Sequence, residues 1–381
     1  MSPILHGTMG DPGDSVQLLE ALAACPTAPF HEEYVARRIT AVCRELDLPV
    51  ERDAYGNLVV WHRGASASGR AHRPRRPIAF GAHMDHPALE VVEAEPLTGR
   101  LLGGTPRQCF DRPVPIRFIH DGGETPGLIT GHVDAGGSTG LRLEASRAIA
   151  SGAFAVYDVG PFRDVDGLLY QPAADDLAGC AAILSALARC AAQGIPADVA
   201  GVFTRCEEVG LIGATLVARQ RLLPPDTVVV SLEASRTLPG AEIGGGPVIR
   251  VGDATMAFHP AGEAVLRRAR ARLAAQQPEA RVQRQLMSGG TCEAVAYALA
   301  GYVTTGIAFP LGNYHNAGPD FTIAAEYIHR ADLETGADLL VAAAECMAED
   351  APVEPVAVRL TQRADEAAQR LRATAQSWAL T

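Results

Sequence analysis

The chain has 381 residues, of which 48% are hydrophobic and 20% charged, so it can bury a large core and form more than one domain. Its formal net charge of −11 argues against nucleic acid or an anionic membrane as a partner, because both attract basic surfaces. All 33 of its basic residues are arginine, which excludes a Schiff-base lysine and a lysine-containing phosphate loop.

Nothing in the sequence predicts a membrane segment or an oxidised compartment. No apolar run approaches the roughly 20 residues that span a bilayer, and the first residues lack the basic and apolar regions of a signal peptide. The eight cysteines include no C-x-x-C pair, so we expect buried free thiols. The protein is therefore expected to be cytoplasmic.

The hydrophobic pattern predicts helices and strands that alternate along most of the chain. Amphipathic helices at 14–24 and 31–46 precede strands at 56–61 and 78–82. The second half is predicted to contain helix 175–192, strand 198–204, helix 212–220, strand 227–232, helix 261–275, strand 281–286, helix 291–299, strand 303–309 and helix 324–348. Such alternation is typical of an α/β fold with a doubly wound sheet covered on both faces.

Residues 88–168 interrupt this alternation with short β-like runs separated by Gly and Pro. Runs of this kind cannot continue a doubly wound sheet, so we expect a small β domain inserted into the α/β domain. The predicted division is a discontinuous catalytic domain formed by 1–87 and 169–350, an inserted β domain formed by 88–168, and a peripheral tail formed by 351–381.

Acidic and histidine residues recur at the predicted carboxyl edge of the sheet. They occur as His83-Met84-Asp85, Asp175-Asp176, Glu207-Glu208, Glu233 and His315. Open α/β folds keep their sites at this edge, and like charges crowd there at a high cost unless a cation holds them. A metal site is therefore the first hypothesis.

Most of these groups also have a simpler explanation when they are taken alone, although a charged residue that ends a buried strand, as Glu233 does, is more often functional. A lone His83 is more often a hydrogen-bonded structural residue, and one aspartate of Asp175-Asp176 suffices to cap a helix. Glu207-Glu208 reads as a solvated loop pair, although one carboxylate can bind metal while the other accepts a proton from a metal-bound water. Together the groups offer two histidines and enough carboxylates for two Zn²⁺-like ions.

The order of these groups resembles that of the co-catalytic zinc peptidases. Their ligands come as His, Asp, Glu, Asp or Glu, and His, with a catalytic Glu directly before the ligand Glu. Within this clan, the secreted leucyl-aminopeptidase-like family has no domain between the first two ligands, and the aminoacylase and dipeptidase family places its extra domain after the fourth ligand. An inserted β domain after His83 is similar instead to the tetrahedral aminopeptidases, which include glutamyl, lysyl and deblocking enzymes.

Further matches to that family are Gly245-Gly-Pro-Val-Ile249 with Asp253, Gly289-Gly-Thr291 and Thr305-Gly-Ile-Ala-Phe-Pro310. The resemblance covers roughly residues 14–349.

The resemblance implies a set of roles for the candidate residues. His83 and Glu233 are expected to bind one metal, Glu208 and His315 the other, and Asp175 to bridge them. The metals are expected to be two divalent ions per chain, Zn²⁺ in the first place, with Co²⁺ or Mn²⁺ as alternatives.

Two more roles and one backbone feature follow from the same resemblance. Glu207 is expected to be the general base, and Asp85 to accept the second ring N–H of His83. The Asp175–Asp176 peptide bond is expected to be cis. Peptides are the implied substrates, and the implied assembly is a homo-oligomer, from a dimer up to a dodecamer, with the inserted domain offering an assembly surface.

The chain departs from the family pattern at a few positions. Glu233 stands where Asp is more usual, His86 where an acidic residue is common, and Cys292-Glu293 where the family has Asp-Ala. We therefore predict a di-metal aminopeptidase that hydrolyses N-terminal residues from peptides and leave its substrate class open. The alternatives are a related metal-dependent deacylase or carboxypeptidase on the same site, or a non-catalytic scaffold of this fold.

Overall fold

The computed structural model describes residues 11, 13–64, 76–120, 123–133, 140–349 and 355–375. The described residues form two compact units, divided after Ala348. The second unit contains one helix, α8 (Pro355–Ala375), in the region predicted as a peripheral tail. No helix in the described part of the chain is long and apolar enough to cross a membrane.

The first unit is built on an eight-stranded mixed sheet with the order β1-β2-β12-β3-β13-β16-β14-β15. In that order the strands are Val50–Arg52, Leu58–His62, Val199–Thr204, Ile78–His83, Val228–Arg236, Val303–Leu311, Val248–Asp253 and Gln283–Met287. The central strands β12, β3, β13 and β16 are parallel, and β2 and β14 run antiparallel to them. The central strands are almost wholly buried, which explains their continuous apolar sequences.

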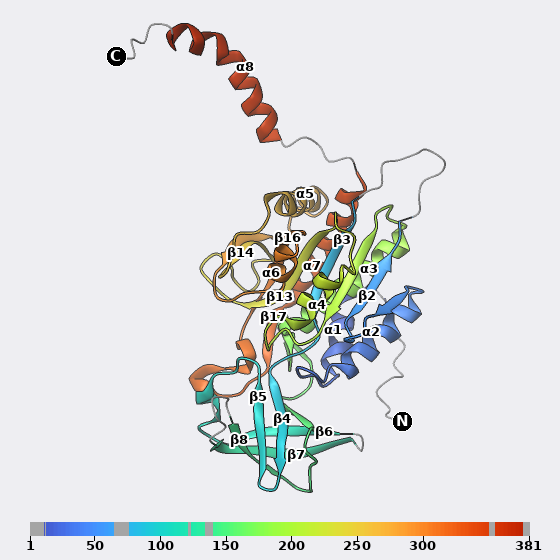
Figure 1. Ribbon diagram of the computed structural model, residues 1–381, viewed down its shortest axis with the longest axis vertical. Helices are drawn as coiled ribbons and strands as arrows, with labels where there is room; N and C mark the ends of the chain where they lie inside the picture. The colour runs from blue at the N-terminus through green and yellow to red at the C-terminus, as the bar shows by residue number, and fades with distance from the viewer. Residues whose placement is uncertain are drawn as a thin grey trace. The chain divides into compact units, whose positions relative to one another are not determined.

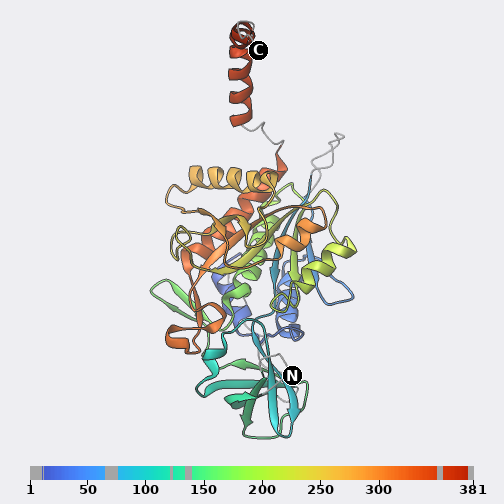
Figure 2. The ribbon, with the colours of Figure 1, turned by 60° about the vertical axis from the view of Figure 1, so that its left-hand side comes forward.

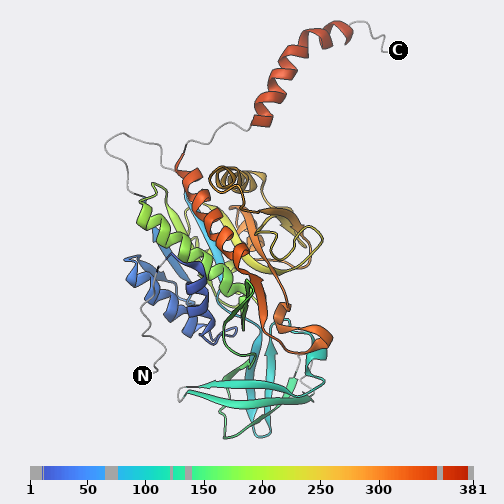
Figure 3. The same ribbon diagram turned by 180° about the vertical axis from the view of Figure 1, so that it is seen from behind.

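Helices cover both faces of this sheet, as the alternation predicts. One face carries α1 (Ser15–Ala23), α2 (Glu33–Glu45), α3 (Ala174–Gln193), α5 (Pro260–Gln276) and α7 (Arg330–Ala348), and the other carries α4 (Ile212–Gln220) and α6 (Ala294–Leu299). Figure 3 shows the blue, green and red helices of the first face. Along β13, Val228 and Val230 join the larger core and Val229 joins the smaller one, because successive side chains in a strand point to opposite faces. The predicted doubly wound fold is confirmed.

The interrupted region forms a closed barrel with the strand order β4-β5-β8-β7-β6-β9. Its strands are, in chain order, Ala88–Ala94, Leu97–Leu102, Val114–His120, Gly123–Val133, Gly140–Ala145 and Phe154–Tyr157. The barrel has its own apolar core, which includes Phe110 and Phe118. Figures 1 and 2 show it below the eight-stranded sheet, in cyan and green.

One predicted helix begins later than expected. Residues Glu326–His329, predicted as the start of helix 324–348, form strand β17 in a three-stranded sheet with β10 (Arg163–Val165) and β11 (Leu168–Gln171). Gln171 pairs with Glu326 in this sheet, and α7 begins only at Arg330. The strand places the Glu326 carboxylate within hydrogen-bond distance of the backbone N–H groups of Asp175 and His315. Helical periodicity in the sequence cannot reveal such a tertiary contact.

Candidate active site

The elements of the sheet bring the predicted metal ligands together. His83 ends β3, Glu208 follows β12, Glu233 lies in β13, Asp175 lies at the start of α3, and His315 follows β16. The side chains of His83 and Asp175 are almost fully buried, and that of Glu208 is 4% exposed. Residues far apart in the sequence therefore meet at the carboxyl edge of parallel strands.

Asp175 lies between the two histidines. Its Oδ1 atom is 3.3 Å from Nε2 of His83, and its Oδ2 atom is 3.7 Å from Nε2 of His315. Nε2 of His83 is also 3.5 Å from Glu233, and Nε2 of His315 is 3.3 Å from Glu208. Each histidine thus faces one glutamate of its own, Glu233 or Glu208, and one oxygen of Asp175, which the two histidines share.

The unpaired atoms of this cluster suit a metal ion. Nε2 of His83, Oδ1 of Asp175, Oε1 of Glu208 and Oε2 of Glu233 are buried and have no hydrogen-bond partner among the described residues. Atoms of His83, Asp175 and Glu208 that can ligate a metal also lie within 4.8 Å of one another. Buried polar atoms are normally paired, so their convergence indicates a site for cations held by nitrogen and oxygen ligands.

The pKa shifts show how costly the cluster is without a cation. Burial and the charge of Glu233 raise the pKa of Asp175 to about 8. Burial and neighbouring carboxylates raise the pKa values of Glu207 and Glu208 well above the ordinary value. Burial opposes ionisation of Glu233 as well, but His83 holds its pKa below the usual range. Metal binding must therefore displace protons from this cluster.

Asp85 contacts both the first histidine and the glutamate pair. The ring Nδ1–H of His83 donates to the main-chain oxygen of Asp85 at 3.0 Å, whereas the carboxylate oxygen lies 3.6 Å away. The main-chain oxygen, rather than the expected carboxylate, is therefore the acceptor. The carboxylate instead accepts the backbone N–H groups of Glu207 at 2.9 Å and Glu208 at 3.1 Å. Asp85 thus connects the end of β3 to the segment that follows β12.

The sequence reasoning missed the role of Glu326. This fully buried carboxylate accepts the backbone N–H of Asp175 at 3.0 Å and that of His315 at 2.7 Å. His315 has a positive φ of 56°, which L residues rarely adopt, so a strong acceptor for its N–H helps to hold it there. The Asp175–Asp176 peptide bond is cis, as the resemblance implies.

His86 and Asn316 form a second link between the same two segments. Nδ1 of His86 lies 2.7 Å from the main-chain oxygen of Asp175, and Nε2 lies 2.8 Å from Oδ1 of Asn316. The Asn316 amide nitrogen donates to the main-chain oxygens of Pro172 and Ala324, which fixes this orientation of its side chain. His86, which the sequence showed only as a departure from the family pattern, therefore ties Asp175 to the loop of His315 through Asn316.

The barrel also reaches the site. The Thr105 hydroxyl donates to the main-chain oxygen of His315 at 3.2 Å and accepts a hydrogen bond from the Tyr157 hydroxyl. A Cβ atom at Gly104 would lie only 2.8 Å from Nδ1 of His315, so the absence of a side chain lets the backbone approach the ring. The segment after β5 therefore forms part of the wall around the second histidine.

Two further charged groups lie buried beside the ligands. Glu293, noted in the sequence only as a departure, is fully buried, and burial raises its pKa to about 7. Arg250 is 2% exposed, and its positive charge favours the ionised form of Glu233. Arg250 had no sequence signal and Glu293 only that departure, because nothing in the local pattern shows that Arg250 of β14 and Glu293, directly before α6, point toward this edge.

A buried set of histidines and carboxylates around one shared aspartate, on a mixed α/β sheet, defines a metal-dependent hydrolase. Residues 132–339, more than half of the chain, match the M42 glutamyl aminopeptidase family, and the chain belongs to that family. It is a peptide hydrolase, a metal-dependent aminopeptidase. The predicted family is thus confirmed, and the aminopeptidase is favoured over the deacylase, carboxypeptidase and scaffold alternatives.

Solved structures share this fold. The TET aminopeptidase of a marine sediment Thaumarchaeota archaeon is 22% identical, with a TM-score of 0.71 over 88% of this chain and 97% of that chain. The aminopeptidase of Desulfurococcus kamchatkensis is 21% identical, with a TM-score of 0.70 over 88% and 95%. The Pyrococcus horikoshii TET1 peptidase is 22% identical, with a TM-score of 0.69 over 87% and 99%.

Glu326→Gln is expected to weaken metal binding about 10- to 100-fold, the usual scale for a group that orients metal ligands. The two N–H groups of Asp175 and His315 bond to different oxygens of the carboxylate, so the glutamine amide would turn its NH2 donor toward one of them. Competition with a chromogenic chelator would measure the affinity. Glu334→Gln, on the exposed side of α7, is the matched control and should leave affinity unchanged. Equal affinities in the two variants would contradict this role for Glu326.

The thermal stability of the metal-free protein should fall as the pH rises from about 6.5 to 8. Burial raises the pKa of Asp175 and of Glu326 to about 8, whereas both acids ionise near pH 4 in an unfolded chain. The folded state therefore binds more protons in this window, and the free energy of unfolding decreases with pH. His315, whose pKa is lowered to about 3, has the opposite effect only below about pH 6.5.

Scanning calorimetry with chelator and with saturating metal would test this pH dependence. Bound metal keeps the carboxylates ionised, so the loaded protein should show a much smaller slope. The same slope in both forms, or a rise in Tm of the metal-free form, would contradict the prediction.

Proposed function

We propose that the protein is a two-metal aminopeptidase that removes residues from the N-termini of peptides. One ion would be held by His83, Asp175 and Glu233, and the other by Asp175, Glu208 and His315. The observation that carries this proposal is that the two oxygens of Asp175 face different histidines. Ligand sets of histidine and carboxylate favour Zn²⁺, with Co²⁺ or Mn²⁺ as alternatives.

Bound there, the metals would supply Lewis-acid chemistry, which lowers the pKa of a water molecule and polarises a scissile carbonyl. Glu207 would accept the proton of the attacking water and pass it to the leaving amine. The backbone N–H groups of Glu207 and Glu208 both donate hydrogen bonds to the Asp85 carboxylate. Asp85 therefore positions both the proposed general base and the proposed ligand next to it. Asp85 also holds the His83 ring through its main-chain oxygen. In this proposal Glu207 is the catalytic residue and Asp85 a positioning residue.

Glu207→Gln is expected to keep both metals and the fold but to lose at least about 10²-fold in kcat, the scale of a removed general base. Glu208→Gln should instead lower the metal content, because it removes a ligand. Elemental analysis of dialysed protein and hydrolysis of aminoacyl-arylamides would report the two effects. The reverse result would exchange the two roles, and a single metal in the saturated wild type would exclude the two-metal mechanism.

We also propose that the chain forms a homo-oligomer through its barrel. The Pyrococcus horikoshii TET1 peptidase can assemble into a tetrahedron or a large octahedral shell, and its fold is similar. On the barrel, Val92 in β4 is 49% exposed and Leu128 in β7 is 38% exposed. These two exposed apolar side chains on barrel strands are the positions at which a contact between copies can be tested.

The double variant Val92→Arg/Leu128→Arg should lower the particle mass in light scattering while each chain keeps its metal content. Leu286→Arg is the matched control, because Leu286 is 45% exposed on β15 of the eight-stranded sheet. If the control dissociates and the barrel variant does not, assembly depends on the α/β domain instead.

A further inference from the structure

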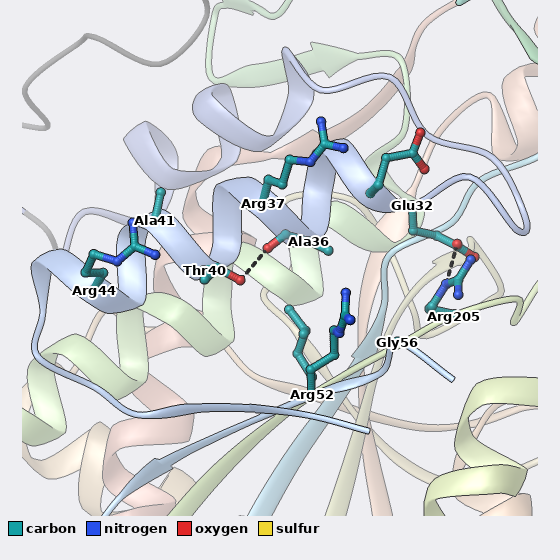
Figure 4. Close-up of a pocket in the computed structure, with 11 residues that line it drawn as sticks. Glu32, Ala36, Arg37, Thr40, Ala41, Arg44, Arg52, Gly56 and Arg205 are labelled. Carbon is teal, nitrogen blue, oxygen red and sulfur yellow. Dashed lines mark hydrogen bonds and ion pairs between the residues drawn. The ribbon is translucent and has the colours of Figure 1, made fainter. Parts of the chain in front are cut away.

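Away from the candidate active site, a cavity of about 470 Å³ lies between helix α2 and strand β1, and none of the proposed metal ligands lines it. Figure 4 shows Arg37 and Arg44 on the helix side, Arg52 on the opposite side, and Arg205 beside Glu32 at one end. The volume falls within the range of small-molecule sites. A cavity lined by four arginines and two glutamates is unusual for a chain whose net charge is −11.

Small residues make the hollow. Ala36, Thr40 and Ala41 line it from α2, where longer side chains would fill the space against the strand. Gly56 has a φ of +90°, and a Cβ there would lie 3.0 Å from a guanidinium nitrogen of Arg205. The glycine therefore leaves room for that arginine in the wall.

Three of the arginines have no carboxylate partner. Arg37, Arg44 and Arg52 are exposed and form no ion pair within the described ranges, although Arg37 lies 5.5 Å from the ring of Tyr34. Many other arginines of the described chain do pair, as Arg189 does with Asp338 at 2.7 Å. A group of unpaired guanidinium groups around one cavity is a site with surplus positive charge.

The acids of the cavity do not neutralise these arginines. Glu32 is committed elsewhere: its carboxylate accepts from Arg205 at 2.6 Å and from the backbone N–H groups of Phe30 and Cys206. Arg205 is equally committed, because its other nitrogens donate to the main-chain oxygens of Tyr55 and Phe30. Among the residues that line the cavity, Glu33 is the one other acid, and its single negative charge does not balance the three unpaired arginines.

The spacing of the charges suits an extended ligand. Arg37 and Arg44 are seven residues apart on α2, so they lie on the same helix face and about 10 Å apart along its axis. Arg52 faces them from the edge strand β1. Guanidinium groups bind phosphate and carboxylate oxygens in a bidentate manner, and a polyphosphate places several such charges along one short chain, as a row of separated arginines requires. We propose that this cavity binds a small polyphosphate, either free or as the phosphate chain of a nucleotide.

The double variant Arg44→Gln/Arg52→Gln tests this site without touching the committed pair of Arg205 and Glu32. Both positions are exposed, so the fold should be kept. Calorimetric titration with inorganic tripolyphosphate should give saturable binding to the wild type and at least about tenfold weaker binding to the variant. Arg142→Gln/Arg219→Gln removes the same charge from exposed positions elsewhere and should bind like the wild type.

Chelation of metal by the probe affects all three proteins equally, so the difference between the variants isolates the cavity. ATP forms a second arm: affinity equal to that of tripolyphosphate assigns the site to the phosphate chain, and tighter binding assigns it to a nucleotide. Equal binding by the two double variants, or no saturable binding to the wild type, would overturn the proposal. So would a change of particle mass in Arg44→Gln/Arg52→Gln with unchanged anion binding, because the arginines would then serve a contact between copies. None of these outcomes depends on the two-metal mechanism.

Discussion

The crowding of buried carboxylates around Asp175 is the constraint on which the rest of the structure depends. Burial and the Glu233 charge raise the pKa of Asp175 to about 8, so the cluster resists full ionisation by itself. The fold concentrates these groups near the carboxyl ends of the four parallel strands β12, β3, β13 and β16, and cations are what make such an arrangement favourable. A buried cluster of this composition is therefore stabilised by the cations that it binds, and the packing of its side chains alone does not stabilise it.

The groups that hold the ligands act mainly on backbone atoms. Glu326 accepts the N–H groups of Asp175 and His315, and the Asp85 carboxylate accepts those of two successive glutamates. A carboxylate that binds a backbone N–H fixes the direction of the Cα–Cβ bond, which then restricts where the side chain can reach. Glu326 and Asp85 therefore set the positions of the side chains that face the proposed metals. Their carboxylates also add negative charge that a cation must offset.

The sequence predicted the fold class and the candidate ligands because both depend on local patterns. Buried parallel strands read as continuous apolar runs, and charges at their ends stand out against them. The order of elements could not show that β17 replaces the first turns of a predicted helix, since pairing with β11 is a tertiary effect. For the same reason Glu326 and Arg250 gave no signal, and Glu293 stood out only as a departure from the family pattern: their importance depends on neighbours that are distant in the sequence.

The contact of the barrel with His315 joins two features that appear separate in the sequence. Thr105 holds the main chain of His315, and Gly104 lies against its ring, so the second histidine is bounded by the barrel on one side and by Glu326 on the other. If copies of the chain meet through their barrels, as proposed, the contact would lie on the same small domain that supports His315, a proposed metal ligand. Assembly and metal affinity would then be linked through one short segment, and the inserted domain would have a role in the site even though it supplies none of the proposed ligands.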